Sequence, residues 1–142
     1  MELQQLFSRY QVAINSIYRG INNTLKNQVH PDITADQFSI LQYIHHQQAC
    51  TSTQISTVFG VGKSAVTAVI NRLDEKELIE RKRDPKDRRI IELSLTEVGE
   101  QLVKQTEREL YRIIGEKLSH FDKVEIENYI YALERLASLM EE

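Results

Sequence analysis

The sequence is poor in cysteine and has no long apolar run. Cys50 is the single cysteine among 142 residues, so no intramolecular disulfide can form, which fits a reducing cytoplasm. No apolar segment is long enough to span a bilayer. Residues 1–7 contain neither the basic segment nor the apolar segment that directs export. We therefore expect a cytoplasmic protein.

Motifs that carry enzymatic or metal chemistry are also absent from the sequence. It contains no nucleophile elbow, phosphate-binding loop, HExxH pair or paired catalytic carboxylates. His45 and His46 are adjacent, so on a helix they point about 100° apart and cannot chelate one metal ion at the usual i, i+4 spacing. Cys50 is interpreted as a small buried apolar residue. We expect no enzyme, no cofactor and no metal site.

Charge is distributed unevenly along the chain, whose formal net charge is −3. Residues 51–95 carry nine basic and seven acidic side chains, whereas residues 96–142 carry six basic and eleven acidic ones. Within residues 80–89 there are six basic and three acidic groups. Such a local basic patch attracts phosphate whatever the overall sign of the charge. The alternative is an ordinary solvated surface hairpin.

The segment from residue 51 to residue 62 is predicted to form a short helix followed by a tight turn. Thr51 and Gln54 have the spacing of a capping box, so the helix begins near Ser52. The Gly60-Val61-Gly62 turn ends it, because glycine tolerates positive φ. The apolar face of this helix is predicted to hold Ile55, Val58 and Phe59.

A second short helix is predicted from Lys63 to Lys76. Its apolar residues recur at i, i+3, i+4 and i+7, the pattern of a helix with one buried face. They are Val66, Val69, Ile70 and Leu73. The opposite face is polar and not acidic, as a helix lying in a DNA major groove requires. The candidate DNA-reading residues on this face are Lys63, Ser64, Thr67 and Asn71.

A β-hairpin is predicted to follow, with strands at Leu78–Arg83 and Ile90–Leu95 around a turn that contains Pro85. Asp87 and Arg89 are two residues apart, so in an extended arm they point the same way and the carboxylate can brace the guanidinium. A helix-turn-helix followed by a basic hairpin is a winged helix. The candidate DNA-binding residues of this wing are Lys86, Asp87, Arg88 and Arg89.

Amphipathic helices are predicted on both sides of the winged helix. One runs from Glu2 to Gln28, and a shorter one enters at the Thr34–Gln37 capping box. Helices from Glu97 to Lys117 and from the N-cap Asp122 onward follow the wing. We predict a mainly α fold with a small β-hairpin wing (α+β).

The expected domain layout is one domain over residues 1–142. The winged helix-turn-helix occupies residues 34–95, and dimerisation helices occupy residues 1–30 and 97–142. We favour a dimer because the two chain ends carry long apolar stripes, which gain most by packing on a symmetric copy. The alternative is that all these stripes form the core of a monomer.

In its order of motifs the chain resembles the MarR family of transcriptional regulators. The matching segments are Thr34-x-x-Gln37-Phe38, Gly60–Thr67, Arg72–Ile79, Asp84–Arg89 and Leu95–Gly99. The resemblance implies a homodimer built from the first and the last two helices, which binds palindromic operators and in most members represses transcription. It also implies that the Asp-x-Arg motif of the wing lies at Asp87 and Arg89, with the arginine entering the minor groove.

The resemblance further implies release from DNA by a small aromatic ligand that binds between the dimer helices and the winged helix. Candidate lining residues are Tyr10, Tyr18 and Tyr43. Two positions depart from the family pattern. Glu77 replaces the usual glycine, so the second helix is expected to end without an easy left-handed cap. Ala68 replaces a common basic residue, so no DNA contact is expected there. The alternative function is a winged-helix protein-interaction module without sequence-specific DNA binding.

Overall fold

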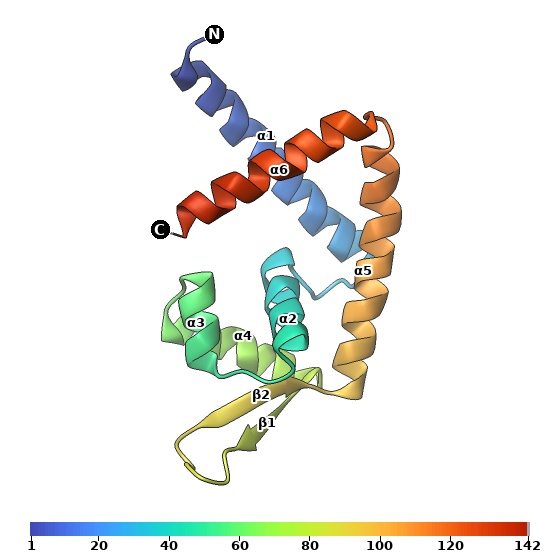
Figure 1. Cartoon of the computed structure of the whole chain (residues 1–142). Coiled ribbons are helices and arrows are strands. Elements are labelled where there is room, and N and C mark those ends of the chain that lie inside the picture. Colours follow the sequence, from blue (N-terminus) through green and yellow to red (C-terminus); the bar gives the residue numbers. More distant parts are fainter. Residues whose placement is uncertain (142) are drawn as a thin grey trace. The chain divides into compact units, whose positions relative to one another are not determined.

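A computed structural model describes residues 1–141 of the chain. It is mainly helical with one two-stranded antiparallel sheet, as predicted (Figure 1). The chain divides into two compact units, one from Met1 to Glu107 and one from Arg108 onward. The elements in chain order are α1 (Leu3–Thr24), η1 (Leu25–Val29), α2 (Ala35–Gln47), α3 (Ser52–Phe59), α4 (Lys63–Glu75), β1 (Ile79–Arg83), β2 (Ile91–Leu95), α5 (Glu97–Leu118) and α6 (Lys123–Met140).

The core of the first unit joins α2, α3 and α4 to the hairpin. Leu41, Ile55 and Leu73 are completely buried, one from each of these helices. Burying one such side chain stabilises the fold by about 1.5–3 kcal/mol, so each of the three helices is held to this core by at least one contribution of that size. One predicted core residue is misplaced. Val58 is exposed, and Ile55 is the one residue of α3 that is fully buried.

The connections at the start of each short helix follow the local sequence. Capping boxes are formed by Thr34 with Gln37 and by Thr51 with Gln54, in which each threonine oxygen accepts from the backbone N–H three residues on. Gly60 ends α3 with a φ of 64°, the left-handed conformation that glycine adopts without steric cost. These predicted boundaries are confirmed.

The end of α4 corrects the expectation at Glu77. This residue adopts the left-handed conformation with a φ of 60° although it is not glycine. The N–H of Leu78 donates to the carbonyl of Leu73 at 3.0 Å, and the N–H of Glu77 donates to that of Asp74 at 2.9 Å. This pair of bonds is a Schellman motif, in which apolar residues usually occupy the positions of Leu73 and Leu78, and both of these are buried.

The same turn is tied to the start of α5. The hydroxyl of Thr96 donates to the carbonyl of Glu77 at 2.7 Å, and its backbone N–H donates to the carbonyl of Leu78 at 3.0 Å. Thr96 also accepts from the N–H of Gly99 at 3.0 Å, so it caps α5. These bonds fix the direction in which β1 leaves α4.

The hairpin pairs β1 with β2 from Ile79 opposite Leu95 to Arg83 opposite Ile91. Each strand is one residue shorter at its start than predicted. Cys50 extends the sheet, because its backbone exchanges hydrogen bonds of 3.0 and 2.7 Å with Leu93. The linker before α3 therefore anchors the base of the wing.

The N-terminal helix differs from the single helix predicted over Glu2–Gln28. Its α-helical part ends at Thr24, and Leu25–Val29 forms a π-helical turn. Leu25 is the one apolar residue of this predicted helix that is fully buried. The N–H of His30 closes the turn on the carbonyl of Leu25 at 2.7 Å. Leu25, the first residue of the π turn, is buried, whereas the apolar residues of α1 are exposed or half-buried.

The second unit consists of the end of α5 and all of α6. Asp122 caps α6, and its carboxylate accepts from the backbone N–H of Glu125 at 2.9 Å in the predicted capping box. The apolar stripe of α6 is mostly exposed. No helix among residues 1–141 is both long and apolar enough to cross a membrane.

Candidate nucleic-acid interface

The polar face of α4 presents the predicted recognition residues to solvent. Val66, Ile70 and Leu73 are buried beneath it and fix the rotation of the helix about its axis. Consequently the other face carries Lys63, Ser64, Thr67 and Asn71, all of them exposed. The side chains at 63, 67 and 71 are four residues apart and therefore line one edge of the helix.

Asn71 is engaged by a residue that the sequence did not suggest. The guanidinium of Arg81, on β1, donates through Nη2 to Oδ1 of Asn71 at 2.7 Å. Its Nε lies 3.6 Å from Oδ2 of Asp74. Arg81 therefore links the wing to two side chains of the recognition helix. Strand alternation alone could not have identified this contact, because it depends on how β1 crosses α4.

The tip of the wing holds an arginine braced by a carboxylate. Nε and Nη2 of Arg89 each lie 3.1 Å from an oxygen of Asp87 in a bidentate pair. The backbone N–H of Arg89 also donates to Asp87 at 3.1 Å. The side chain of Arg89 is 91% exposed, whereas that of Asp87 is 35% exposed. The guanidinium is thus held away from the loop.

The backbone around this pair differs from the extended arm that was predicted. The N–H of Ile90 donates to the carbonyl of Asp87 at 3.0 Å, so Asp87 to Ile90 form a turn. Asp87 and Arg89 meet because of this turn rather than because of strand alternation. The turn holds the backbone of Asp87 and Arg89 close enough for their side chains to pair.

Two further residues frame the wing loop. Oδ1 of Asp84 accepts from the N–H of Lys86 at 2.7 Å, which is the side-chain turn that aspartate makes before Pro85. Arg83 donates to the carbonyl of Arg88 at 2.8 Å. The Asp-Pro pair signalled the turn in the sequence, but the contact of Arg83 had no sequence signal. Lys86 and Arg88 are left exposed on the loop.

The electrostatics of the wing follow from the Asp87–Arg89 pair. The hydrogen bond from the Arg89 side chain holds the pKa of the Asp87 carboxyl below its ordinary value of 3.8. The carboxylate in turn raises the pKa of Arg89 above its ordinary value. Both groups are therefore charged at neutral pH, and the pair presents a fixed cation beside a partly shielded anion.

Comparison with known proteins decides the family. The sequence model of the MarR family matches residues 33–91. The HTH-type transcriptional regulator MhqR of Bacillus subtilis is 26% identical over 126 residues, which are 88% of this chain and 87% of MhqR. The HTH-type transcriptional repressor MdtR of the same organism is 32% identical over 97 residues, or 68% of this chain and 63% of MdtR. The chain belongs to the MarR family.

The fold agrees with a solved structure from Streptococcus pneumoniae, that of FabT in complex with DNA. The TM-score is 0.84 at 23% identity, over 99% of this chain and 98% of FabT. At this identity the likeness establishes the winged-helix fold. The family model and the sequence relatives make this MarR-family protein a transcriptional regulator, and not an enzyme.

The three tyrosines predicted as candidate ligand-lining residues have three different neighbours. The hydroxyl of Tyr18 donates to Asp36 at 2.9 Å, which ties α1 to the first turn of α2. Tyr43 packs edge-on against Phe59 with ring centroids 5.7 Å apart. Tyr10 stacks on Phe7, which precedes it in α1. Each tyrosine has its own contact with a neighbouring residue, and none of these contacts brings the three together. A ligand site shared by the three therefore remains a prediction.

Cys50, the single cysteine, is buried next to strand β2 of the wing. Its side chain is 3% exposed, and burial raises its pKa to about 11. At neutral pH only a very small fraction is thiolate, which is the reactive form. The structure supports the interpretation of Cys50 as a small core residue.

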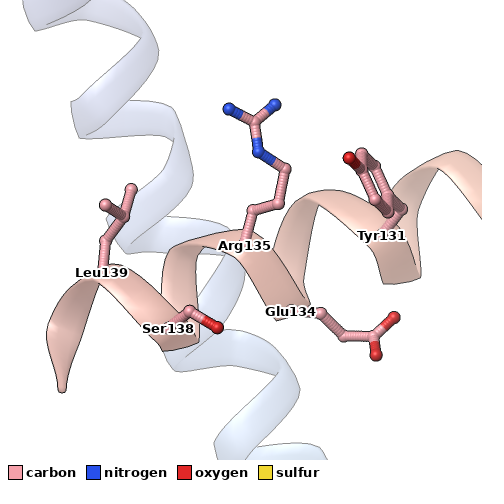
Figure 2. Close-up of a pocket in the computed structure, with 5 residues that line it drawn as sticks. All are labelled: Tyr131, Glu134, Arg135, Ser138 and Leu139. Carbon is pink, nitrogen blue, oxygen red and sulfur yellow. The ribbon is translucent and has the colours of Figure 1, made fainter.

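A shallow hollow lies along α6 in the second unit (Figure 2). Tyr131, Arg135 and Leu139 rise on one side of the helix, and the guanidinium of Arg135 lies 5.9 Å from the ring centroid of Tyr131. Glu134 and Ser138 complete the lining. All five residues come from one helix, so the hollow is part of an open helix face.

Proposed function

We propose that this MarR-family regulator is a homodimeric repressor that binds palindromic operators. The observation that carries the DNA-binding part is the geometry of Arg89. A guanidinium that is almost fully exposed yet held along its Nε–Nη2 edge by a carboxylate is ordered in advance for a specific contact. The narrow minor groove of A·T-rich DNA has an enhanced negative potential that attracts such an arginine.

In this proposal the two parts of the winged helix have different tasks. The α4 face reads base edges in the major groove through Lys63, Ser64, Thr67 and Asn71. The wing places Arg89, braced by Asp87, in the minor groove. Lys86 and Arg88 contact phosphates on either side of it.

Binding isotherms test the wing directly. The probes are DNA from upstream of the chain's own coding sequence, with either A·T-rich or G·C-rich flanks, at two salt concentrations. Arg89→Ala is expected to cost about 1–3 kcal/mol of binding and to weaken the preference for A·T flanks. Asp87→Ala should do the same more mildly, because it loosens the arginine without removing it.

Lys86→Ala is the matched control on the same loop. Because Lys86 is proposed to contact a phosphate, its replacement should weaken binding to all DNA sequences alike. It should also reduce the slope of log affinity against log salt concentration by about one unit. If Arg89→Ala binds both operators as the wild type does, the assignment of the wing is wrong. If the wild type prefers no sequence at any salt concentration, the protein-interaction alternative is favoured instead.

The homodimer is supported by apolar residues that the chain leaves open on its terminal helices. On α1, Leu3 is 81% exposed, and on α6, Leu139 is 60% exposed. Monomeric proteins seldom leave such continuous apolar stripes in water. A second copy covers them and brings two winged helices to two half-sites, which multiplies weak contacts.

Light scattering coupled to size exclusion tests the dimer. The full chain is expected at twice its monomer mass, and deletion of residues 122–142 is expected to leave monomeric or insoluble protein. Leu139→Glu should shift the full chain toward monomer and weaken operator binding. The control Asn128→Glu adds the same charge at another exposed position of α6 and should remain dimeric. A chain that is monomeric yet binds its operator at full affinity contradicts the proposal.

Release by a small aromatic ligand completes the proposed function, with Tyr10, Tyr18 and Tyr43 as candidate lining residues. Exposed and half-buried tyrosines offer both an apolar ring and a polar hydroxyl to such a ligand. The test adds salicylate-like compounds to the operator complex. Loss of binding in the wild type, diminished in Tyr18→Phe, supports the site. Unchanged binding over the soluble range of these compounds argues against it.

A further inference from the structure

The side-chain amide of Asn71 has two ends with opposite hydrogen-bonding character. Its oxygen Oδ1 accepts, and its amino group Nδ2 donates two hydrogens. Bidentate recognition of adenine needs both ends, since the oxygen accepts from N6 of the base and the amino group donates to N7. Which end faces outward therefore decides what an asparagine on a recognition helix can read.

In this protein the acceptor end is already in use. Oδ1 of Asn71 accepts from Nη2 of Arg81 at 2.7 Å. A guanidinium carries only donors, so the oxygen and not the amino group must face it. The orientation of the amide follows from this chemistry, and Nδ2 is the end left to point away from β1.

Arg81 is itself held in place from two sides. Its Nε lies 3.6 Å from Oδ2 of Asp74, one turn beyond Asn71 on α4. On β1 it stands opposite Leu93, which is buried, so its stem starts at the inner face of the wing. Both partners belong to the recognition helix, and the guanidinium bridges them as a fixed unit.

We propose that Arg81 is a specificity-determining residue that restricts Asn71 to acceptor groups on the DNA. The proposal rests on the proposed function, in which the α4 face lies in the major groove. With Oδ1 occupied, Asn71 donates to N7 or O6 of guanine, to O4 of thymine, or to N7 of adenine without the second bond to N6 that makes adenine recognition bidentate. The oxygen has a second lone pair, but the amino group of adenine would have to approach it beside the guanidinium, and these donor groups repel each other.

The test measures base preference rather than affinity alone. Full-length wild-type protein selects operators from randomised duplex DNA, and each position of the best operator is then replaced by all four base pairs. Asn71→Ala should flatten the preference at one position in each half-site, which identifies the pair that Asn71 contacts. Arg81→Met removes every donor but keeps an apolar stem, and should raise the relative affinity for adenine at that position about tenfold.

Two further variants separate specificity from folding. Arg81→Lys keeps a donor and a charge near Oδ1 and should keep the wild-type preference. Lys82→Ala removes one positive charge from the neighbouring, outward-facing strand position and should leave the preference at the Asn71 position unchanged. In the double variant Arg81→Met, Asn71→Ala, the gain for adenine should disappear.

The outcomes distinguish this inference from the function on which it rests. If the wild type selects a defined operator and Arg81→Met keeps the same preference at the Asn71 position, the inference is overturned and the proposed function stands. An Asn71→Ala variant that alters no position also overturns it, because Asn71 then reads no base. If the wild type enriches no sequence at all, both proposals fail.

Discussion

Replacing Gly99 with alanine tests the junction that connects the recognition helix to α5. A Cβ atom built on Gly99 would lie 2.0 Å from the carbonyl oxygen of Leu78 and 3.0 Å from its carbonyl carbon, whereas ordinary contact begins at 3.4 Å. The obstacle is backbone and cannot rotate away. Either the carbonyl or the start of α5 must therefore move by more than an ångström.

The cost of that movement can be worked out from the contacts at the junction. The Leu78 carbonyl accepts from the N–H of Thr96, and losing such a bond costs about 0.5–1.5 kcal/mol. Forcing an additional methyl group into packed structure costs about 1–3 kcal/mol. We therefore expect Gly99→Ala to lower the free energy of unfolding by about 1.5–4.5 kcal/mol.

Urea denaturation followed by circular dichroism measures this change at equal protein concentrations. Gly20→Ala is the matched control, because Gly20 lies within α1 and a Cβ there meets no atom within 4 Å. It should stabilise the protein by about 0.5–1 kcal/mol, through the higher helix propensity of alanine. A Gly99→Ala protein as stable as the wild type would refute the close approach of Gly99 and Leu78.

Three other predictions concern single positions. Glu77→Gly should raise the free energy of unfolding in urea by about 1 kcal/mol, since glycine adopts the left-handed conformation without steric cost. In Arg89→Ala, NMR titration should show the pKa of Asp87 rising toward 3.8. Because that pKa is lowered in the folded state, the pair stabilises the fold above about pH 3.8, and its contribution is lost as pH falls through the folded value. Cys50, with a pKa of about 11, should react slowly with iodoacetamide at neutral pH in the native protein and rapidly in urea.

The helix boundaries and the wing were predictable because they depend on short stretches of chain. The Thr51–Gln54 and Asp122–Glu125 capping boxes form between residues three apart, and the left-handed turn at Gly60 needs only a glycine. The buried face of α4 follows from helical periodicity, which brings residues three and four apart together wherever the helix forms. Each of these features is decided before distant parts of the chain meet.

The candidate site was predicted in composition but not in geometry. The pairing of Asp87 with Arg89 was anticipated, yet it arises from a turn rather than from the extended arm that the alternation suggested. The three tyrosines were chosen for their chemistry, and the structure gives each a separate neighbour. Residue type indicates what a side chain can do, whereas its position in the fold decides what it meets.

By itself the sequence determined the order of helices and hairpin, the basic wing and the polar face of α4, since all of these follow from local pattern and composition. Only the tertiary structure decided that Glu77 adopts a left-handed conformation, because Thr96 holds its carbonyl from nineteen positions further along the chain. It likewise decided that Asn71 is bound by Arg81, a contact that forms only where β1 crosses α4. Such contacts join segments that approach each other when the core closes, so no local pattern can specify them.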